Sequence, residues 1–173
     1  MDAREYPGIR VSLSGHLDKL VVPIKIDISF GDSITPKEIE YEYKTMLGHE
    51  SIEIPSYNLE TILAEKLQCI FSRGVLNTRM RDFYDVYMLF SIYRERISKK
   101  TLKNAFAVTS KIRGTNKNYE IYKEALKEIE KDKGMQYLWN SYKEKYDYAA
   151  NISFGQIINV INSLLTEYMN EDE

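Results

Sequence analysis

The hydrophobic period of the chain changes near residue 55, and this change constrains the fold more than composition does. Apolar residues alternate with polar ones over 9–13, 20–30 and 38–46, and Ile52 and Ile54 continue the pattern before Pro55. From Leu59 onwards the apolar residues recur at spacings of three and four, which is typical of amphipathic helices. Strands followed by helices predict an α+β fold, in which helices cover an N-terminal mixed or antiparallel β-sheet and a helical bundle follows it.

Turn and capping residues predict where these elements begin and end. Gly15 and Asp18 mark a turn between the first two strands, and Asn58 is the expected N-cap of the first helix, which Arg73-Gly74 ends. Gly134 is expected to separate two later helices. The expected helices span 58–73, 78–94, 101–111, 119–133, 135–148 and 154–169. We therefore divide the chain into a core over 1–95, with its strands within 8–54 and its two helices at 58–73 and 78–94, and a C-terminal helical subdomain over 96–173.

Composition excludes several classes of protein. The 173 residues carry 24 basic and 26 acidic side chains and are 43% hydrophobic, so the chain is neither disordered nor covered by a uniformly nucleic-acid-binding surface. The single cysteine, Cys69, cannot form an internal disulfide, and His16 and His49 lack the spacing of structural zinc ligands. Because no stretch approaches the roughly 20 apolar residues of a membrane span, the expected location is the cytoplasm.

Lys66 lies near the centre of the apolar face of the first expected helix, between Leu63 and Ile70. One interpretation is structural: the four-carbon stem covers apolar surface while the ammonium reaches water, or the ammonium pairs with a carboxylate of the core. The other is functional: the cation is aimed into a cleft to meet an anionic ligand such as a triphosphate.

Two acids near the start of the second expected helix complement this lysine. Asp82 shares a side with Val86 and Leu89 and leans toward the core, whereas Asp85 turns further outward. Either acid alone could serve only as a partner of the helix dipole. Because successive helices direct Lys66 and Asp82 toward the same interior, we expect a buried ion pair or a joint ligand site.

Asp27 interrupts an apolar strand as Ile-Asp-Ile. A carboxylate on a central strand can hold a divalent cation over the sheet. Alternatively, Asp27 lies on a solvated face with Lys25 and Ser29.

Basic residues are concentrated between residues 94 and 117, where eight of them accompany one acid. Such a segment forms either a solvated helix face or a phosphate-binding surface for RNA or DNA. The candidates for a nucleic-acid surface are Lys99, Lys100, Lys103, Lys111 and Arg113. Further along the chain Tyr137, Tyr142, Tyr146 and Tyr148 could stack bases or could pack between helices.

Four segments in collinear order carry a family resemblance. They are YPGIR (6–10), KIDISFGDSITP (25–36), ILAEKL (62–67) and NTRMRDFYDVY (77–87). Over residues 6–115 the chain closely resembles the AbiEii/AbiGii toxin family, nucleotidyltransferase-like proteins of type IV toxin–antitoxin and phage abortive-infection systems.

The resemblance implies a DNA polymerase β-like nucleotidyltransferase core, of which 1–95 would be part. It implies magnesium-dependent transfer from a nucleoside triphosphate to tRNA or another RNA, and a cognate antitoxin as partner. Asp27 matches a strand carboxylate that would hold the metal, and Lys66 matches a helix lysine that would neutralise the triphosphate. Asp82 and Asp85 match the acids of an Asp-x-x-Asp motif and would be catalytic with Lys66. The candidates for binding the nucleotide are Lys66, Arg79 and Arg81.

One family motif is missing. Members open with a Gly-Ser loop and an Asp-x-Asp pair that binds the catalytic metals, and the sequence contains neither dipeptide nor pair. We therefore expect an incomplete core, which leaves open whether the chain transfers nucleotides or is a non-catalytic module that binds nucleotide, RNA or protein. An incomplete sheet would also expose an edge through which the chain could form a homodimer.

Overall fold

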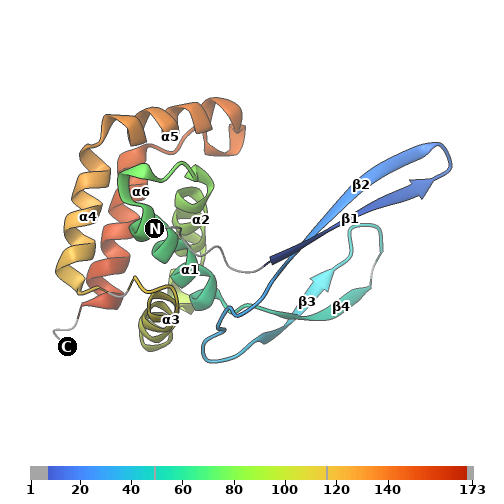
Figure 1. Cartoon of the computed structure of the whole chain (residues 1–173), viewed down its shortest axis with the longest axis horizontal. Helices are drawn as coiled ribbons and strands as arrows, with labels where there is room; N and C mark the ends of the chain where they lie inside the picture. The colour runs from blue at the N-terminus through green and yellow to red at the C-terminus, as the bar shows by residue number, and fades with distance from the viewer. Residues whose placement is uncertain (1–7, 49, 116, 171–173) are drawn as a thin grey trace. The chain divides into compact units, whose positions relative to one another are not determined.

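The computed structural model describes residues 8–48, 50–115 and 117–170. Tyr6 and Pro7 of the first resembling segment, and His49, lie outside the described residues. Strands come first and helices follow (Figure 1), so the predicted α+β fold is confirmed. The chain divides into two compact units, Met1–Ser33 and Ile34–Glu173.

The first unit is an antiparallel hairpin of β1 (Gly8–Leu17) and β2 (Leu20–Ser29). Its register places apolar residues opposite each other on one face, in the pairs Ile9 with Ile28 and Val11 with Ile26. The turn contains only two residues, and its first, Asp18, has a φ of 51°. Gly15 lies within β1 opposite Val22, so its predicted place in the turn is wrong, because Asp18 supplies the left-handed residue that a tight turn needs.

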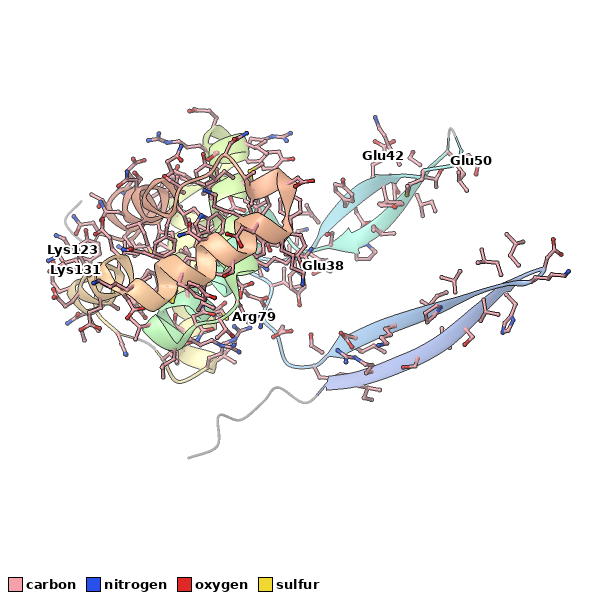
Figure 2. The ribbon with its side chains drawn as sticks, turned by 90° about the horizontal axis from the view of Figure 1, so that it is seen from above. Glu38, Glu42, Glu50, Arg79, Lys123 and Lys131 are labelled. Carbon is pink, nitrogen blue, oxygen red and sulfur yellow. The ribbon has the colours of Figure 1, made fainter. Side chains whose placement is uncertain are left out.

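The second unit begins with another antiparallel hairpin, of β3 (Ile39–Lys44) and β4 (Ser51–Ser56). Within the described residues the strands form two separate two-stranded sheets, so the expected single sheet covered by helices is wrong. Every residue of β2 and β3 is exposed, and β2 is not a central strand. Side chains such as that of Glu42 project from β3 and β4 into solvent (Figure 2). The strands are exposed because the helices bury their apolar faces against one another and not against a sheet.

The helices pack together into a bundle (Figure 1), and their apolar side chains share one hydrophobic core. They are α1 (Leu59–Arg73), α2 (Met80–Tyr93), α3 (Lys99–Ile112), α4 (Tyr119–Lys131), α5 (Lys133–Lys145) and α6 (Phe154–Leu164), which a π-helical turn (Leu165–Met169) extends. Leu67, Phe83, Trp139 and Ile161 have no exposed surface. Residues on both sides of residue 95 belong to this core, and the predicted division between 95 and 96 stays a prediction. None of the helices in the described ranges is long and apolar enough to cross a membrane.

Capping residues fix the ends of the helices that matter for the site. Asn58 caps α1 as predicted, because its Oδ1 accepts from the Thr61 N–H at 2.8 Å, and its Nδ2 donates to the Thr35 carbonyl at 2.7 Å. Gly74, with a φ of 53°, ends α1 as predicted. The prediction that Gly134 separates two helices is wrong, because Gly134 lies within α5. Asp132 separates them instead, since it ends α4 and its carboxylate accepts from the Met135 N–H at 2.8 Å.

Candidate functional site

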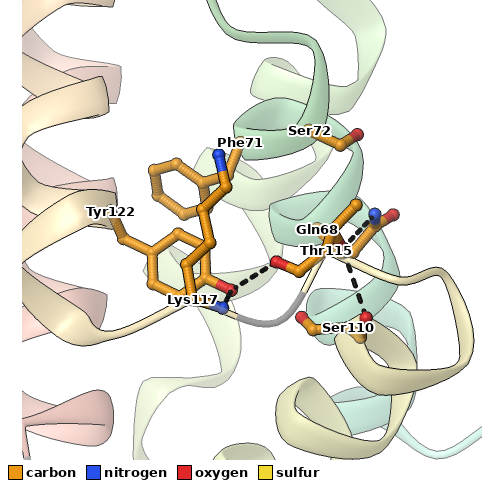
Figure 3. A pocket seen from close by; sticks show the side chains of 7 residues that line it. All are labelled: Gln68, Phe71, Ser72, Ser110, Thr115, Lys117 and Tyr122. Atoms are coloured by element: carbon orange, nitrogen blue, oxygen red, sulfur yellow. Dashed lines mark hydrogen bonds between the residues drawn. The ribbon is translucent and has the colours of Figure 1, made fainter.

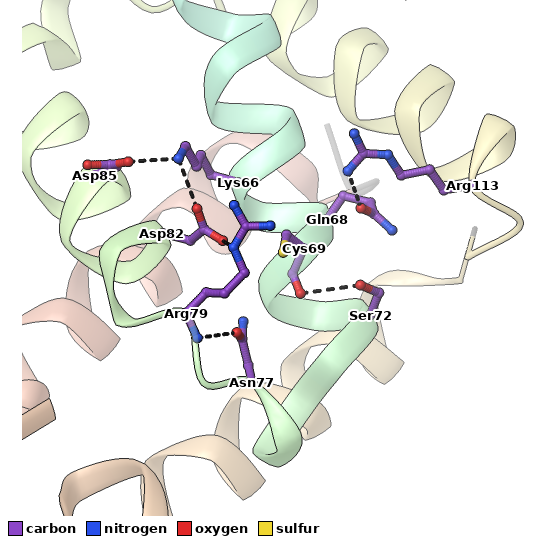
Figure 4. Close-up of polar contacts among 9 residues, drawn as sticks. All are labelled: Lys66, Gln68, Cys69, Ser72, Asn77, Arg79, Asp82, Asp85 and Arg113. Carbon is purple, nitrogen blue, oxygen red and sulfur yellow. Dashed lines mark hydrogen bonds and ion pairs between the residues drawn. The ribbon is translucent and has the colours of Figure 1, made fainter. Parts of the chain in front are cut away.

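Lys66 on α1 is bonded to two carboxylates of α2. Its Nζ donates to Asp82 Oδ1 at 2.9 Å and to Asp85 Oδ2 at 2.7 Å (Figure 4). The exposed fractions of the three side chains are 25% for Lys66, 3% for Asp82 and 26% for Asp85. The helical faces deduced from the sequence therefore converge as expected, with Asp82 toward the core and Asp85 further out.

The electrostatics of this cluster keep Lys66 charged. Burial by itself would lower the pKa of Lys66, but hydrogen bonds and charge attraction from Asp82 and Asp85 outweigh burial and raise the pKa. Lys66 is therefore a cation at neutral pH, at the junction of α1 and α2.

Asp82 also holds a second cation. Its Oδ2 lies 3.1 Å from Arg79 Nε, three residues earlier in the chain. The backbone N–H of Arg79 donates to Asn77 Oδ1 at 2.9 Å, which fixes the approach to α2. Burial, and then the negative charge of Asp82, raise the pKa of the nearby Cys69 thiol. Asp82 is thus the buried anion around which Lys66, Arg79 and a neutral thiol are arranged.

A groove of about 550 Å³ opens beside this cluster. That volume is typical of small-molecule sites, which span roughly 300–1,000 Å³. Its lining includes four cationic side chains and two anionic ones, so its charge favours an anionic ligand. The lining residues are Lys66, Thr78, Arg79, Met80, Arg81, Asp82, Asp85, Leu138, Ser141, Tyr142, Lys145 and Tyr146. The structure therefore brings together all the residues expected to be catalytic or to bind nucleotide.

The opposite wall of the groove comes from α5, and the sequence did not indicate it. Leu138, Ser141 and Lys145 were not candidates, although their spacing places them on one helix face with Tyr142. Tyr142 lines the groove, and its ring stacks on that of Trp139 with centroids 5.3 Å apart, so it takes part in packing, whereas base stacking stays a prediction. Burial, and then the hydrogen bond with the Tyr148 hydroxyl, raise the pKa of Tyr142.

Asp27 belongs to the first compact unit and forms an ion pair there. Its Oδ2 accepts from Arg10 Nη2 at 2.9 Å on an exposed part of the hairpin. This hydrogen bond lowers the pKa of Asp27. Asp27 thus lies on a solvated face, which was one of the two interpretations of the sequence.

A magnesium ion needs several oxygen ligands close together. Across residues 8–48, 50–115 and 117–170, no three His, Cys, Asp or Glu side chains gather as metal ligands. Asp82 Oδ1 and Asp85 Oδ2 already accept hydrogen bonds from the ammonium of Lys66. The described residues by themselves therefore do not fit a magnesium site.

The candidates for the nucleic-acid surface lie on and just after α3, away from the lining of the groove. Lys99, Lys100, Lys103 and Lys111 are exposed. Arg113 is half-buried and donates to Gln68 Oε1 at 2.7 Å (Figure 4). These four lysines are exposed on α3, and Lys103 Nζ donates to the Asn170 carbonyl at 3.3 Å, whereas Arg113 is held against α1.

A second, smaller cavity lies where α1, α3 and the start of α4 meet (Figure 3). It holds about 50 Å³, compared with roughly 30 Å³ for one water molecule in the liquid. Its lining includes Gln68, Thr115 and Tyr122, whose hydroxyl donates to the Thr115 carbonyl at 3.1 Å. This cavity is too small for a nucleotide.

Comparison with known proteins agrees with the resemblance found in the sequence. The family model described as nucleotidyl transferase AbiEii toxin, type IV TA system, matches residues 1–160. No curated protein and no solved structure matches the chain significantly. Since the matched range covers most of the 173 residues, the chain belongs to the AbiEii family of nucleotidyl transferase toxins of type IV toxin–antitoxin systems.

Proposed function

We propose that the groove binds a nucleoside triphosphate and that Lys66 contacts its phosphates, for transfer of a nucleotide to tRNA or another RNA. The observation that carries this proposal is the position of the Lys66 ammonium, held between Asp82 and Asp85 at the wall of a cationic groove. Family membership supports a nucleotide substrate and an antitoxin partner.

Binding requires a change of partner at Lys66. Asp82 is almost fully buried, whereas a quarter of the Asp85 side chain is exposed. A phosphate oxygen entering from solvent therefore replaces Asp85 more readily than Asp82. Asp82 keeps the ammonium in place during this exchange, while Arg79 and Arg81 add positive charge to the same groove.

The other proposed roles are based on family membership and on which side chains are exposed to solvent. The exposed lysines of α3 are proposed to contact the RNA backbone, which would make RNA affinity fall steeply with salt. Nucleotidyltransferases generally use a divalent metal, and the metal-binding role of Asp27 stays a prediction. The cytoplasmic location also stays a prediction, as does a homodimer formed through a sheet edge.

One observation favours a second candidate function. Because the described residues provide no cluster of metal ligands, the chain could bind nucleotide, RNA or a partner protein without transferring a nucleotide. The two candidates share the groove and differ in chemistry, so a single assay separates them.

That assay incubates the protein with magnesium, each labelled nucleoside triphosphate in turn and bulk RNA, and measures both incorporation and nucleotide affinity. We expect Lys66→Ala to lower nucleotide affinity by about tenfold or more, because a hydrogen bond to a charged group contributes roughly 1.5–3 kcal/mol. The matched control is Lys131→Ala, an exposed lysine on α4 outside the groove (Figure 2), which should leave affinity unchanged.

Each result has a defined meaning. Incorporation by the wild type and its loss in Lys66→Ala support transfer. Tight binding without incorporation supports the binding module. A lower melting temperature with unchanged nucleotide affinity in Lys66→Ala would show that Lys66 is a structural ion-pair partner and would refute its proposed contact with the phosphates.

A further inference from the structure

The two walls of the groove differ in chemistry. Residues of α1 and the start of α2 supply the acids and three of the four cations. The α5 wall, formed by α5 and by Tyr146 at its C-terminal end, instead presents Leu138 and the rings of Tyr142 and Tyr146. A nucleotide has the same division, since its phosphates are anionic and its base is a flat aromatic ring with a π-face. The groove therefore matches both ends of such a ligand.

The rings of the α5 wall are fixed before any ligand binds. Tyr146 stacks on Tyr148, with ring centroids 5.3 Å apart and planes at 25°. The ring centroids of Tyr142 and Tyr146 are 4.7 Å apart, and the Tyr142 hydroxyl lies 2.8 Å from the Tyr148 hydroxyl. A rigid aromatic surface loses little conformational entropy when a base stacks on it.

The ring of Tyr146 already holds one group at stacking distance. Nζ of Lys145 lies 5.4 Å from the centroid of this ring. Lys145 is exposed and its flexible stem can rotate away, whereas Tyr146 is half-buried and stays in the wall. A base can therefore displace the Lys145 ammonium from the ring, and the ammonium stays available to the phosphates.

We propose that the α5 wall is a nucleobase subsite, in which the base of the bound nucleoside triphosphate stacks on Tyr146 while its phosphates meet Lys66. This inference rests on the proposed function and adds to it a role for α5, none of whose residues was a predicted catalytic or nucleotide-binding residue. Tyr142 and Tyr148 are positioning residues, since they hold the ring of Tyr146. Because every base has a π-face, such a subsite accepts all four bases.

The test compares two ligands that differ only in the nucleoside. Affinities for ATP and for inorganic tripolyphosphate are measured by calorimetry with the full chain. We expect Tyr146→Ala to weaken ATP binding by about tenfold, because stacking on one aromatic ring contributes roughly 1–3 kcal/mol per base. Tripolyphosphate affinity should not change. Tyr146→Phe should retain ATP affinity, and Tyr146→Leu, which keeps bulk without a π-face, should lose it.

Tyr137→Ala is the matched control, because Tyr137 is a 71% exposed tyrosine of α5 that lies outside the groove. An equal loss for both ligands in Tyr146→Ala, or no loss for ATP, would overturn the subsite. Loss of affinity for a short single-stranded RNA alone would assign the ring to the acceptor and also overturn it. The proposed function is tested separately, by wild-type binding of tripolyphosphate and its loss in Lys66→Ala; if the wild type binds neither ligand, both proposals fail.

Discussion

Replacing Asp82 with alanine is expected to lower the free energy of unfolding by about 3 kcal/mol. The side chain of Asp82 is 3% exposed and holds both Lys66 and Arg79, so its removal leaves a partly buried ammonium with only one carboxylate. Breaking a buried pair costs roughly 3–5 kcal/mol, and the 25% exposure of Lys66 places the effect at the lower end. Chemical denaturation measures the difference. Asp85→Ala, at a more exposed carboxylate, should cost roughly 1 kcal/mol or less.

The same pair predicts a pH dependence. The pKa of Lys66 is raised above its usual value of 10.5, so its stabilising contribution is fully present below that pH and is lost as the pH rises through the raised value. The difference in unfolding free energy between wild type and Asp82→Ala should therefore be constant near neutral pH and shrink above pH 10.5. A difference that stays constant there would show that Asp82 stabilises the chain through contacts other than Lys66.

Replacing Trp139 with alanine is expected to lower the free energy of unfolding by about 4 kcal/mol, the largest effect that we expect. Trp139 has no exposed surface, and its Nε1 donates to the Ile152 carbonyl at 2.9 Å. Its ring also contacts Phe154, the first residue of α6. Truncation therefore leaves a large cavity and an unpaired carbonyl. The melting temperature and a denaturation curve report the loss.

Tyr137, two residues earlier in α5, is again the control, because its ring is exposed and Tyr137→Ala should change stability by no more than about 0.5 kcal/mol. A cost below about 1 kcal/mol for Trp139→Ala, in contrast, would mean that α5 is not anchored by this ring. The groove would then lack a fixed second wall.

The Lys66 cluster could be predicted from the sequence because helical period is a local property. Spacing alone places Lys66 on the apolar face of α1 and Asp82 on the inner side of α2, and short connections make successive helices neighbours. The prediction that both side chains turn to one interior needed no further information. The structure added that Asp85 binds the same ammonium as Asp82.

Strand pairing and the α5 wall could not be predicted from the sequence, because they depend on contacts between segments far apart in the chain. Alternation shows that a segment is a strand but not which strand pairs with it, so one sheet was expected where the described residues form two. The α5 wall depends on how Trp139 packs beside the start of α6, which no local pattern determines. Tyr142 and Tyr146 carried a signal in their spacing, but that spacing fits packing as well as stacking.

Amide proton exchange in the two separate hairpins can detect whether a further strand pairs with either of them. In the described sheets each strand has one neighbour, so alternate backbone N–H groups along β1, β2, β3 and β4 point to an open edge. Those amides exchange their protons with water faster than the amides bonded across the hairpin. A strand added by an antitoxin or a second copy would slow the fast set in one hairpin and leave the other unchanged. The pattern of amide exchange rates along each hairpin thus shows whether its open edge is paired with another strand.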